Sequence, residues 1–600
     1  MKSIVQPILD KYGKDKTRIM DILIDIQEEV GHIPEEAIQI IAEQVKLSNV
    51  DVMQTISFYH FFTCVPKGKY SIYLNDSAVA CMLGRDKVAQ AFEETAGGQF
   101  GSVTEDGLIG LFNTSCIGMN DQEPSAIING QIFTKLTPFR AKEIIKDMKA
   151  GKQMDEIVNE GNGDGQNANI LVNSMVMNNI RKKGPILSSD FKIGDSIKRI
   201  TSVNPKYVID TIKKSNIRGR GGAGFPTGLK WEFCSRSEET ERYVFCNADE
   251  GEPGTFKDRV ILTEKAYMVF EGMVIAGYAI GAKTGILYLR YEYRYLKDYL
   301  ENILYDMRSQ GFLGKNIAGK NGFDYDIRIQ FGAGAYVCGE ESALIESAEG
   351  KRGEPRDRPP FPVEKGYLGK PTVVNNVETL CAAVYIMTKG PDAFKSFGTK
   401  DSTGTKILSI SGDCTYPGIY EVEWGFSAAD MLEMVGAENV QAIQVGGPSG
   451  TLIGENEFER TICYSDLGTG GSMIIIGKDR NILEDVVLNF TDFFVEESCG
   501  SCSTCRDMTY ILRQTLKKII DGQGVPLDIE NLKEWSKYLK ASRCGLGQTS
   551  ANPIVSSIKN FRRFYEEKVQ IDKEFDFGFD LDRAVSESCK AVNRVPNLHE

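Results

Sequence analysis

The chain has 600 residues, of which 42% are hydrophobic and 26% are charged, and its formal net charge is −13. A chain of this length predicts about four domains, each large enough to bury a core. The acidic balance argues against nucleic acid as a partner, because a phosphate backbone requires a basic face. The most apolar passage, residues 268–289, contains Glu271, Lys283 and several glycines, so we expect a buried helix and a strand there and no membrane insertion.

The cysteine content indicates the compartment. The 14 cysteines stand in an acidic chain that does not open with a charged segment followed by an apolar one, so we expect no secretory signal. In a reducing compartment, clustered cysteines bind metal more often than they form disulfides. The sequence therefore predicts a cytoplasmic protein with a metal site.

The first 150 residues divide into a helical part and a mixed α/β part. Residues 1–65 are helical in pattern, with apolar residues at helical spacing between Ile19 and Val30. Residues 66–150 predict a small α/β domain. Its expected strands are 70–74, 108–112, 125–128 and 131–134, and its expected helices are 86–94 and 140–149. Residues 151–200 predict a connector, in which the glycine-rich run 161–165 is a flexible joint because it lacks a helix and a cation.

A glycine-rich loop opens the region from 201 to 395. Five glycines lie between Gly219 and Gly228, so many backbone N–H groups are free to approach a phosphate closely. Lys230 and two arginines add positive charge. The G-x-G-x-x-G match within this loop is weak, because residues 205–217 predict a helix where that fingerprint requires a strand. We interpret the loop as a phosphate cradle.

Four further polar segments follow in the same region, at 243–254, 332–341, 356–362 and 371–379. Strand ends beside glycines are where α/β folds place side chains that face ligands. No histidine lies between 61 and 598, and no Ser/His/Asp or Cys/His set is present, which argues against acid–base hydrolysis. A bound redox cofactor explains these segments better.

The last third holds a small β module and a cysteine set. Residues 396–478 predict a β-grasp domain with strands at 405–411, 418–423, 442–445 and 472–476 and a helix at 427–435. Residues 479–562 return to helix, and 563–600 are a C-terminal tail. Three cysteines spaced C-x2-C-x2-C and a distant fourth favour a [4Fe–4S] cluster over zinc, which usually takes paired C-x2-C knuckles. The expected ligands are Cys499, Cys502, Cys505 and Cys544.

These motifs carry a resemblance. The glycine loop, the Asn-Ala-Asp-Glu-Gly-Glu-Pro-Gly turn, the Cys-Gly-Glu-Glu-Ser turn, the Asn-Asn-Val-Glu-Thr segment and the cysteine run resemble the NADH-binding flavoprotein subunit of respiratory complex I. The resemblance covers about 200–562, and residues 1–150 are similar to that complex's small thioredoxin-like subunit. The fusion is most similar to the diaphorase subunits of cytoplasmic NAD-reducing [NiFe] hydrogenases, and related fusions serve NAD-dependent formate dehydrogenases and electron-bifurcating complexes.

The resemblance implies a multidomain α/β fold. A helical part (1–65) and a thioredoxin-like part with a degenerate cluster site (66–150) would precede a linker (151–200). A Rossmann-like domain for FMN and NADH (201–395), a β-grasp domain (396–478) and a C-terminal helical bundle with the iron–sulfur cluster (479–562) would follow. The implied cofactors are FMN, NAD(H) and one [4Fe–4S] cluster.

The resemblance also assigns roles. Residues of the phosphate cradle would be Gly219, Arg220, Gly221, Gly222, Ala223, Gly224 and Lys230. Residues lining the flavin would be Asn247, Asp249, Tyr336, Gly339, Glu340, Asn375, Asn376 and Thr379. Phe225, Phe233 and Phe361 would sandwich the adenine, and Glu250, Glu252 and Glu341 would face the ribose and nicotinamide. Arg358 stands where members of the family often have lysine.

The implied activity is hydride exchange between NAD(H) and FMN, followed by single-electron transfer through the cluster. The implied partners are an iron–sulfur subunit and a hydrogenase or formate dehydrogenase module, and no side chain need act as a nucleophile. A non-catalytic docking scaffold and a zinc-binding regulatory module remain as alternatives. The acidic side chains expected at the ribose predict a preference for NADH over NADPH, because a 2′-phosphate would meet like charge.

The front domain departs from the family pattern of [2Fe–2S] ligands, a C-x4-C pair followed by a C-x3-C pair. Alignment on Cys81 and Cys116 puts Asp76 and Asn120 at the two remaining ligand positions. An amide is a poor ligand for ferric iron, which prefers anionic donors. We therefore expect that the front domain has lost its cluster and serves for docking, with Cys81 and Cys116 as buried thiols.

Overall fold

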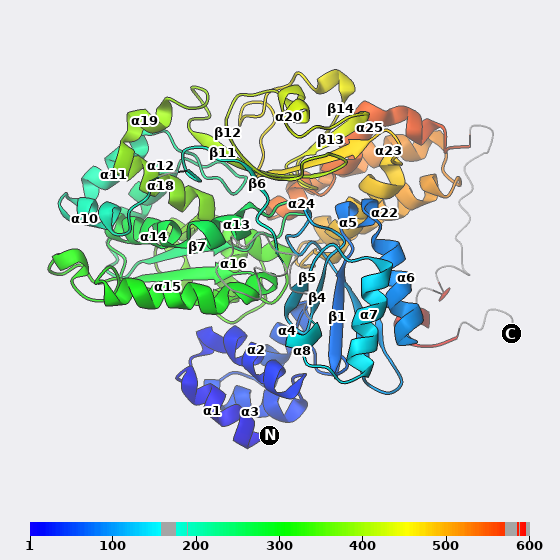
Figure 1. Ribbon diagram of the computed structural model, residues 1–600, viewed down its shortest axis with the longest axis horizontal. Coiled ribbons are helices and arrows are strands. Elements are labelled where there is room, and N and C mark those ends of the chain that lie inside the picture. Colours follow the sequence, from blue (N-terminus) through cyan, green and yellow to red (C-terminus); the bar gives the residue numbers. More distant parts are fainter. Residues whose placement is uncertain (158–175, 189, 571–584, 587–588, 596–600) are drawn as a thin grey trace.

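The computed structural model describes residues 1–157, 176–188, 190–570, 585–586 and 589–595. The joint expected at 161–165 and most of the tail lie outside these residues. Three sheets form the frame, a five-stranded one (β2-β3-β1-β4-β5), a four-stranded one (β10-β7-β8-β9) and a six-stranded one (β14-β13-β15-β11-β12-β6). In Figure 1 the four-stranded sheet lies in the left half of the molecule, the six-stranded sheet lies at the top, and the five-stranded sheet lies at the lower right.

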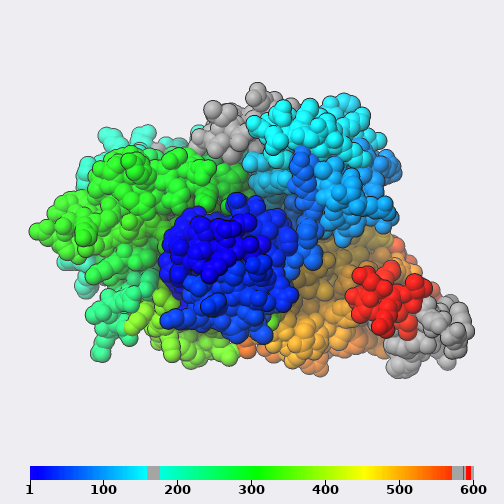
Figure 2. Space-filling model, turned by 90° about the horizontal axis from the view of Figure 1, so that it is seen from below, coloured from blue at the N-terminus to red at the C-terminus, as the bar shows by residue number. Residues whose placement is uncertain are grey.

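Four helices form the N-terminal part: α1 (Lys2–Lys11), α2 (Ile19–Val30), α3 (Glu35–Val45) and α4 (Asn49–Phe58). Their apolar faces join the core of the central region rather than that of the five-stranded sheet. Tyr59 donates to the carbonyl of Lys351 at 2.7 Å. The N–H of Phe61 donates to the carbonyl of Ala333 at 3.0 Å. Figure 2 shows this dark blue part seated against the green central region.

The second part has the thioredoxin-like order that the sequence predicted. Its strands are β1 (Tyr70–Asn75), β2 (Ser102–Val103), β3 (Ile109–Thr114), β4 (Ala126–Ile128) and β5 (Gln131–Phe133). Its helices are α5 (Ala78–Met82), α6 (Arg85–Ala96), α7 (Pro138–Lys149) and α8 (Met154–Ile157). β1 runs parallel to β3 and antiparallel to β4, and β4 and β5 form the expected hairpin.

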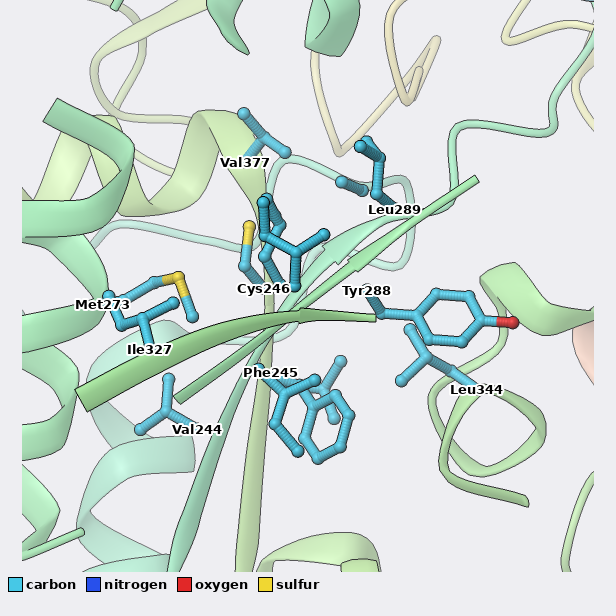
Figure 3. Close-up of a cluster of buried hydrophobic side chains, with 14 of the residues drawn as sticks. Val244, Phe245, Cys246, Met273, Tyr288, Leu289, Ile327, Leu344 and Val377 are labelled. Atoms are coloured by element: carbon cyan, nitrogen blue, oxygen red, sulfur yellow. The ribbon is translucent and has the colours of Figure 1, made fainter. Parts of the chain in front are cut away.

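The central sheet is parallel throughout, with strands β7 (Tyr243–Ala248), β8 (Thr284–Leu289), β9 (Asp326–Phe331) and β10 (Thr372–Asn376). Helices pack around it: α10 (Asp195–Thr201), α11 (Pro205–Lys214), α12 (Thr227–Ser235), α13 (Lys257–Glu264), α14 (Ala266–Ile280), α15 (Lys297–Ser309), α16 (Glu341–Ala348), α17 (Pro362–Lys365), α18 (Val377–Lys389) and α19 (Pro391–Lys395). The inner strands β7 and β8 are mostly apolar because both faces of the sheet are covered, whereas the edge strand β9 alternates apolar residues with Asp326, Arg328 and Gln330. Figure 3 shows Val244, Phe245 and Tyr288 in this core, which also includes Met273 of α14.

Helix α14 and strand β8 are the buried helix and strand expected at 268–289. Glu271 is buried within α14, where its carboxylate accepts from the N–H of Gly194 and from the hydroxyl of Ser196. Among the described helices, none combines the length and the apolar character that crossing a bilayer requires.

The six-stranded sheet contains the expected strands β11 (Thr405–Gly412), β12 (Gly418–Glu423), β13 (Val440–Val445) and β15 (Ser472–Gly477), with α20 (Ala428–Met434) after β12. Two strands were not predicted. β14 (Thr451–Gly454) pairs with β13, and β6 (Ile180–Lys182), from the presumed connector, pairs with β12. A three-residue edge strand gives too little alternation to be seen in a sequence.

The C-terminal part is helical, with α21 (Asn489–Glu496), α22 (Ser503–Ile520), α23 (Pro526–Ser536), α24 (Gly545–Thr549) and α25 (Asn552–Glu566). A π-helix, η7 (Ile482–Leu488), leads into α21, and α25 packs on β14. The short 3-10 segments are η1 (Lys16–Arg18), η2 (Tyr291–Leu296), η3 (Ile317–Gly319), η4 (Tyr336–Gly339), η5 (Tyr367–Gly369), η6 (Glu455–Glu457) and η8 (Lys537–Ala541).

Candidate functional site

The polar segments follow the carboxyl ends of the parallel strands. Asn247 lies at the end of β7, the segment 332–341 follows β9, and Asn375 and Asn376 end β10. Because β7 pairs with β10 and with β8, which in turn pairs with β9, these segments share one edge of the central sheet. The crevice outside this edge is where ligands bind in open α/β sheets.

The glycine loop is a closed turn beside that edge. The N–H of Gly219 donates to the carbonyl of Phe225 at 2.9 Å. None of the amides from Gly221 to Phe225 donates a hydrogen bond within the described part of the chain. Gly222 has φ +121°, and a Cβ at Gly221 would lie 3.3 Å from the Cβ of Asn376. The open amides and the missing Cβ atoms fit a phosphate group.

The loop is held by its arginines and by Thr379. The N–H of Arg220 donates to Oγ1 of Thr379 at 2.8 Å, and the Arg220 guanidinium donates to the carbonyl of Thr403 at 2.6 Å. Arg218 donates to the carbonyl of Gly224 at 2.6 Å and stacks on Tyr464. The arginines therefore fix the backbone of the loop; Arg220 is fully buried, and its Nε has no hydrogen-bond partner among the described residues.

A chain of ion pairs continues from helix α12. Nζ of Lys230 lies 2.9 Å from a carboxylate oxygen of Glu341 and donates to the carbonyl of Val374 at 3.1 Å. Arg358 pairs with Glu340 and lies 3.6 Å from Glu341. Glu340 also caps helix α16, because its Oε2 accepts from the N–H groups of the first turn. These four side chains are only partly buried.

Three aromatic side chains border this chain. Phe225, Phe233 and Phe361 are 46%, 43% and 48% exposed, although large apolar side chains usually bury more of their surface. Phe225 precedes α12, Phe233 lies near its end, and Phe361 begins α17, which packs against α12. The three rings thus lie on neighbouring elements and offer apolar faces to a planar ligand.

The turn after β7 differs from expectation at its two glutamates. Glu250 is buried, and its carboxylate accepts from the N–H of Asp258 at 2.9 Å and from Tyr293 at 2.7 Å. Glu252 accepts from the N–H of Ser449 at 2.8 Å and from Tyr336 at 2.5 Å. Both carboxylates thus accept hydrogen bonds from within the chain; Glu250 is buried, whereas Glu252 and Glu341 are partly exposed.

Asn247, at the end of β7, and Asp249, in the turn that follows, are partly buried. Nδ2 of Asn247 donates to the carbonyl of Gly339 at 2.9 Å, and its Oδ1 accepts from the N–H of Asp249 at 3.0 Å. Oδ2 of Asp249 is buried and has no hydrogen-bond partner among the described residues. Burial raises the pKa of Asp249 well above its ordinary value, although Arg290 opposes the shift. An orphaned buried carboxyl is a group that a bound ligand can satisfy.

A buried charge network beneath the site was not found from sequence. Lys257 pairs with Asp258 at 2.5 Å and with Glu378 at 3.1 Å, and Glu378 also pairs with Lys406. Asn376 joins the network, since its side chain donates to Asp258 at 2.6 Å. Nε1 of Trp231 donates to Oδ1 of Asn375 at 2.8 Å. Lys257, Asp258 and Lys406 look like surface charge in the sequence, and only the fold brings them together with Glu378 and the predicted flavin-lining residue Asn376.

The four cysteines converge between the end of α21, the start of α22 and the segment before α24. The nearby thiols Cys502, Cys544 and Cys499 contribute to the raised pKa of Cys505, after burial, which is the main cause and takes it to about 11. Burial raises the pKa of Cys544. Hydrogen bonds from the backbone N–H groups of Gly547 and Leu546 act to lower this pKa, because they favour the thiolate. Within the described residues, no three His, Cys, Asp or Glu side chains are arranged to hold a single metal ion.

The ligand positions of the front domain form a hydrogen-bonded network. The Sγ of Cys116 donates to Oδ1 of Asn120 at 2.8 Å, and Nδ2 of Asn120 donates to Ser77 and to Glu123 at 3.0 Å each. Burial raises the pKa of Cys116 to about 11 and that of Cys81 to about 12. Burial therefore favours the neutral form of both thiols in this arrangement.

Comparison with known proteins identifies three regions of the chain. A "Nuo51 FMN-binding domain" model matches residues 212–385, a "thioredoxin-like [2Fe-2S] ferredoxin" model matches 5–149, and an "NADH-ubiquinone oxidoreductase-F iron-sulfur binding region" model matches 485–568. The fold and these matches define a complex I-like flavoprotein, an oxidoreductase with an FMN- and NADH-binding domain and a [4Fe–4S] region, fused to a thioredoxin-like domain.

Comparison with individual proteins defines the family more closely. The chain is 47% identical to the NAD-reducing hydrogenase HoxS subunit alpha of Cupriavidus necator over 602 aligned residues, which cover 100% of both chains. It is 41% identical to the NADP-reducing hydrogenase subunit HndC of Solidesulfovibrio fructosivorans, over 63% of this chain and 79% of that one. A crystal structure of NAD+-reducing [NiFe]-hydrogenase in the H2-reduced state matches with a TM-score of 0.87, at 35% identity and 97% coverage of both chains. The chain belongs to the family of NAD-reducing hydrogenase diaphorase subunits.

The cysteine assignment gives a first prediction. Cys81→Ser and Cys116→Ser should leave the iron content of the purified full chain unchanged, because we expect no cluster in the front domain. Cys505→Ser should lower the iron content, because three thiolates hold a [4Fe–4S] cluster less well than four. Anaerobic iron analysis and low-temperature EPR of the reduced protein measure both. A [2Fe–2S] signal that disappears in the Cys116→Ser variant would contradict the prediction.

Proposed function

We propose that this chain exchanges hydride between NAD(H) and FMN and passes electrons singly through its [4Fe–4S] cluster to an iron–sulfur partner subunit of an NAD-reducing hydrogenase. One observation carries the proposal. The segment after β9, which borders the nucleotide edge, also contacts the cluster segment, because the N–H of Tyr336 donates to Glu497 at 2.9 Å. Glu497 lies two residues before Cys499, so the nucleotide edge and the cluster segment are in direct contact.

The chain's own residues would bind and orient the cofactors. The open amides from Gly221 to Phe225 would hold the FMN phosphate, and Asn375, Asn376 and the polar groups around Gly339 would face the flavin and its ribityl chain. FMN, when bound, supplies the conversion between two-electron hydride chemistry and one-electron transfer. Asp249 would keep a proton on its buried carboxyl and offer it as a hydrogen-bond donor. Its raised pKa supports this role.

Exposed aromatic rings support a nucleotide site. We propose that Phe225, Phe233 and Phe361 stack on the adenine, while Glu341 meets the ribose and Lys230 holds Glu341 in place. Glu250 and Glu252 would not contact the nucleotide, since their carboxylates anchor the turn from within. The [4Fe–4S] cluster, when bound by Cys499, Cys502, Cys505 and Cys544, supplies a one-electron carrier.

Flavin reduction and nucleotide binding distinguish this function from that of a docking scaffold. Anaerobic addition of NADH to the purified full chain should bleach the visible absorption of its flavin, whereas a scaffold would leave the spectrum unchanged. Phe361→Ala should raise the apparent Kd for NADH roughly tenfold, because base–aromatic stacking is worth about 1–3 kcal/mol. Phe139→Ala, at a 71% exposed ring of the front domain, is the matched control and should behave as wild type.

Nucleotide preference would follow from Glu341, the acid that we place at the ribose. The chain should prefer NADH, and Glu341→Gln should lower the ratio of kcat/KM for NADH over NADPH about fivefold, since like-charge repulsion in a partly dry site costs on the order of 1 kcal/mol. Glu301→Gln, at an exposed position on α15, is the control. An unchanged ratio in Glu341→Gln would assign the preference to other residues.

The electron exit would lie beside the cluster segment. A hollow of about 460 Å³ there is lined by Val495, Gly500, Tyr510 and Ile511, among others, and the last two side chains are 45% and 39% exposed. Exposed apolar groups around a hollow are typical of a protein interface. We propose that the iron–sulfur partner docks on this face.

The docking proposal predicts a selective defect. Ile511→Asp should weaken assembly with the partner subunit and slow hydrogen-dependent NAD+ reduction, yet leave NADH oxidation by ferricyanide unchanged. Leu527→Asp, at a 55% exposed position on α23, is the control and should assemble normally. Size-exclusion chromatography of the reconstituted complex reports assembly. Equal assembly of both variants with wild type would contradict this location.

A further inference from the structure

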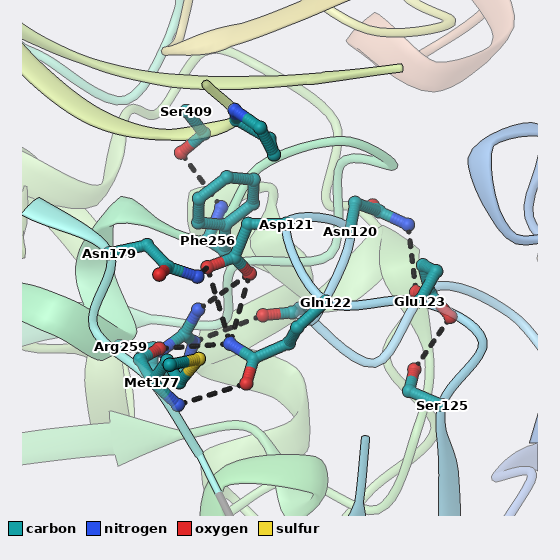
Figure 4. Close-up of polar contacts among 12 residues, drawn as sticks. Asn120, Asp121, Gln122, Glu123, Ser125, Met177, Asn179, Phe256, Arg259 and Ser409 are labelled. Carbon is teal, nitrogen blue, oxygen red and sulfur yellow. Dashed lines mark hydrogen bonds and ion pairs between the residues drawn. The ribbon is translucent and has the colours of Figure 1, made fainter. Parts of the chain in front are cut away.

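The loop from Cys116 to Ser125 in the front domain packs on the flavin side of the central sheet. Figure 4 shows Asn120, Asp121 and Gln122 of this loop beside Phe256 and Arg259 of the central region. Asn120 is 1% exposed and Asp121 is 7% exposed. Polar side chains buried this deeply are held by specific hydrogen bonds.

Asn120 contacts the turn after β7 directly. The N–H of Gly254, the last residue of that turn, donates to Oδ1 of Asn120 at 2.9 Å. Gly254 has φ +87°, and a Cβ there would approach Oγ of Ser472 to 2.3 Å, so only glycine fits at this position. Asn120 is itself fixed through its Nδ2, which donates to Ser77 and Glu123.

Two buried arginines reinforce the contact. Nη2 of Arg259 pairs with Asp121 at 3.0 Å, and its Nε donates to the carbonyl of Gly118 at 3.1 Å. Arg290 donates to the carbonyl of Cys116 at 2.7 Å and also to the carbonyl of Glu250. Arg290 therefore joins the loop to the turn that contains Asp249 and Glu250.

We propose that Asn120 is a positioning residue for the flavin site. The loop 116–125, at which the family resemblance would place two cluster ligands, acts here as a brace that holds the turn Asp249–Gly254 in the conformation that receives FMN. This inference rests on the proposed function, because it takes that turn as a wall of the flavin site. With this brace, the front domain would support cofactor binding although it holds no electron carrier.

The test uses the full chain in wild-type, Asn120→Ala and Asn120→Asp forms. Asn113→Ala, at an exposed asparagine of the same domain, is the control. Hydrogen–deuterium exchange of the flavin-free proteins should show peptides over 249–256 exchanging about tenfold faster in Asn120→Ala, while strand β1 keeps its protection. The same variant should bind FMN about tenfold more weakly, measured by quenching of flavin fluorescence, because one buried hydrogen bond is lost and its N–H left unpaired.

Asn120→Asp keeps an oxygen that can accept from Gly254 but loses the Nδ2 donor to Ser77 and Glu123, so it should recover part of the protection and affinity, and it serves if the alanine variant does not fold. Unchanged exchange at 249–256, faster exchange spread equally over β1, or unchanged FMN affinity would each overturn the inference. If wild type binds FMN but NADH does not reduce it, the hydride function fails while the brace stands. If wild type does not bind FMN, both fail.

Discussion

The architecture depends on the short turn from Asp249 to Gly254, which is fixed from several sides. Asn120 of the front domain accepts a hydrogen bond from the N–H of Gly254, and the N–H of Ser449 donates to Glu252. Within the central region, Tyr293 donates to Glu250 and Tyr336 donates to Glu252. Each of these bonds is buried or partly buried, where an unsatisfied partner would cost about 1–3 kcal/mol. The turn can therefore hold one conformation only if the parts around it stay docked, which explains why the flavin domain shares cores with its neighbours.

Local chemistry explains which features the sequence predicted well. The glycine loop is identifiable because few Cβ atoms and a nearby lysine serve one purpose, and the structure leaves its amides open from Gly221 to Phe225. The cysteine spacing is equally specific, and a family model of an iron–sulfur region covers it. Strand β8 was expected within the apolar passage 268–289 and β7 at the start of the polar segment 243–254, as apolar runs of the kind that parallel sheets produce, whereas neither β9 nor β10 was predicted as a strand.

Long-range pairing explains what the sequence could not predict. The sequence predicted that Glu250 and Glu252 face a ligand, yet their carboxylates accept hydrogen bonds from Tyr293 and Ser449, which are distant in the chain. The pairing of β6 with β12 brings together residues about 240 positions apart, and such a short strand has no periodic signal. Nor does any local pattern reveal that Lys406 and Glu378 meet in the core.

The central claim is that one flavin and one cluster carry the electrons, while the front domain carries none and braces the flavin site. A coulometric titration of the purified full chain under anaerobic conditions tests it most directly, because it counts the electrons that the chain accepts. With FMN and iron fully loaded, the account predicts about three electrons per chain, two on the flavin and one on the [4Fe–4S] cluster. About four electrons, with a second cluster signal in EPR, would contradict it.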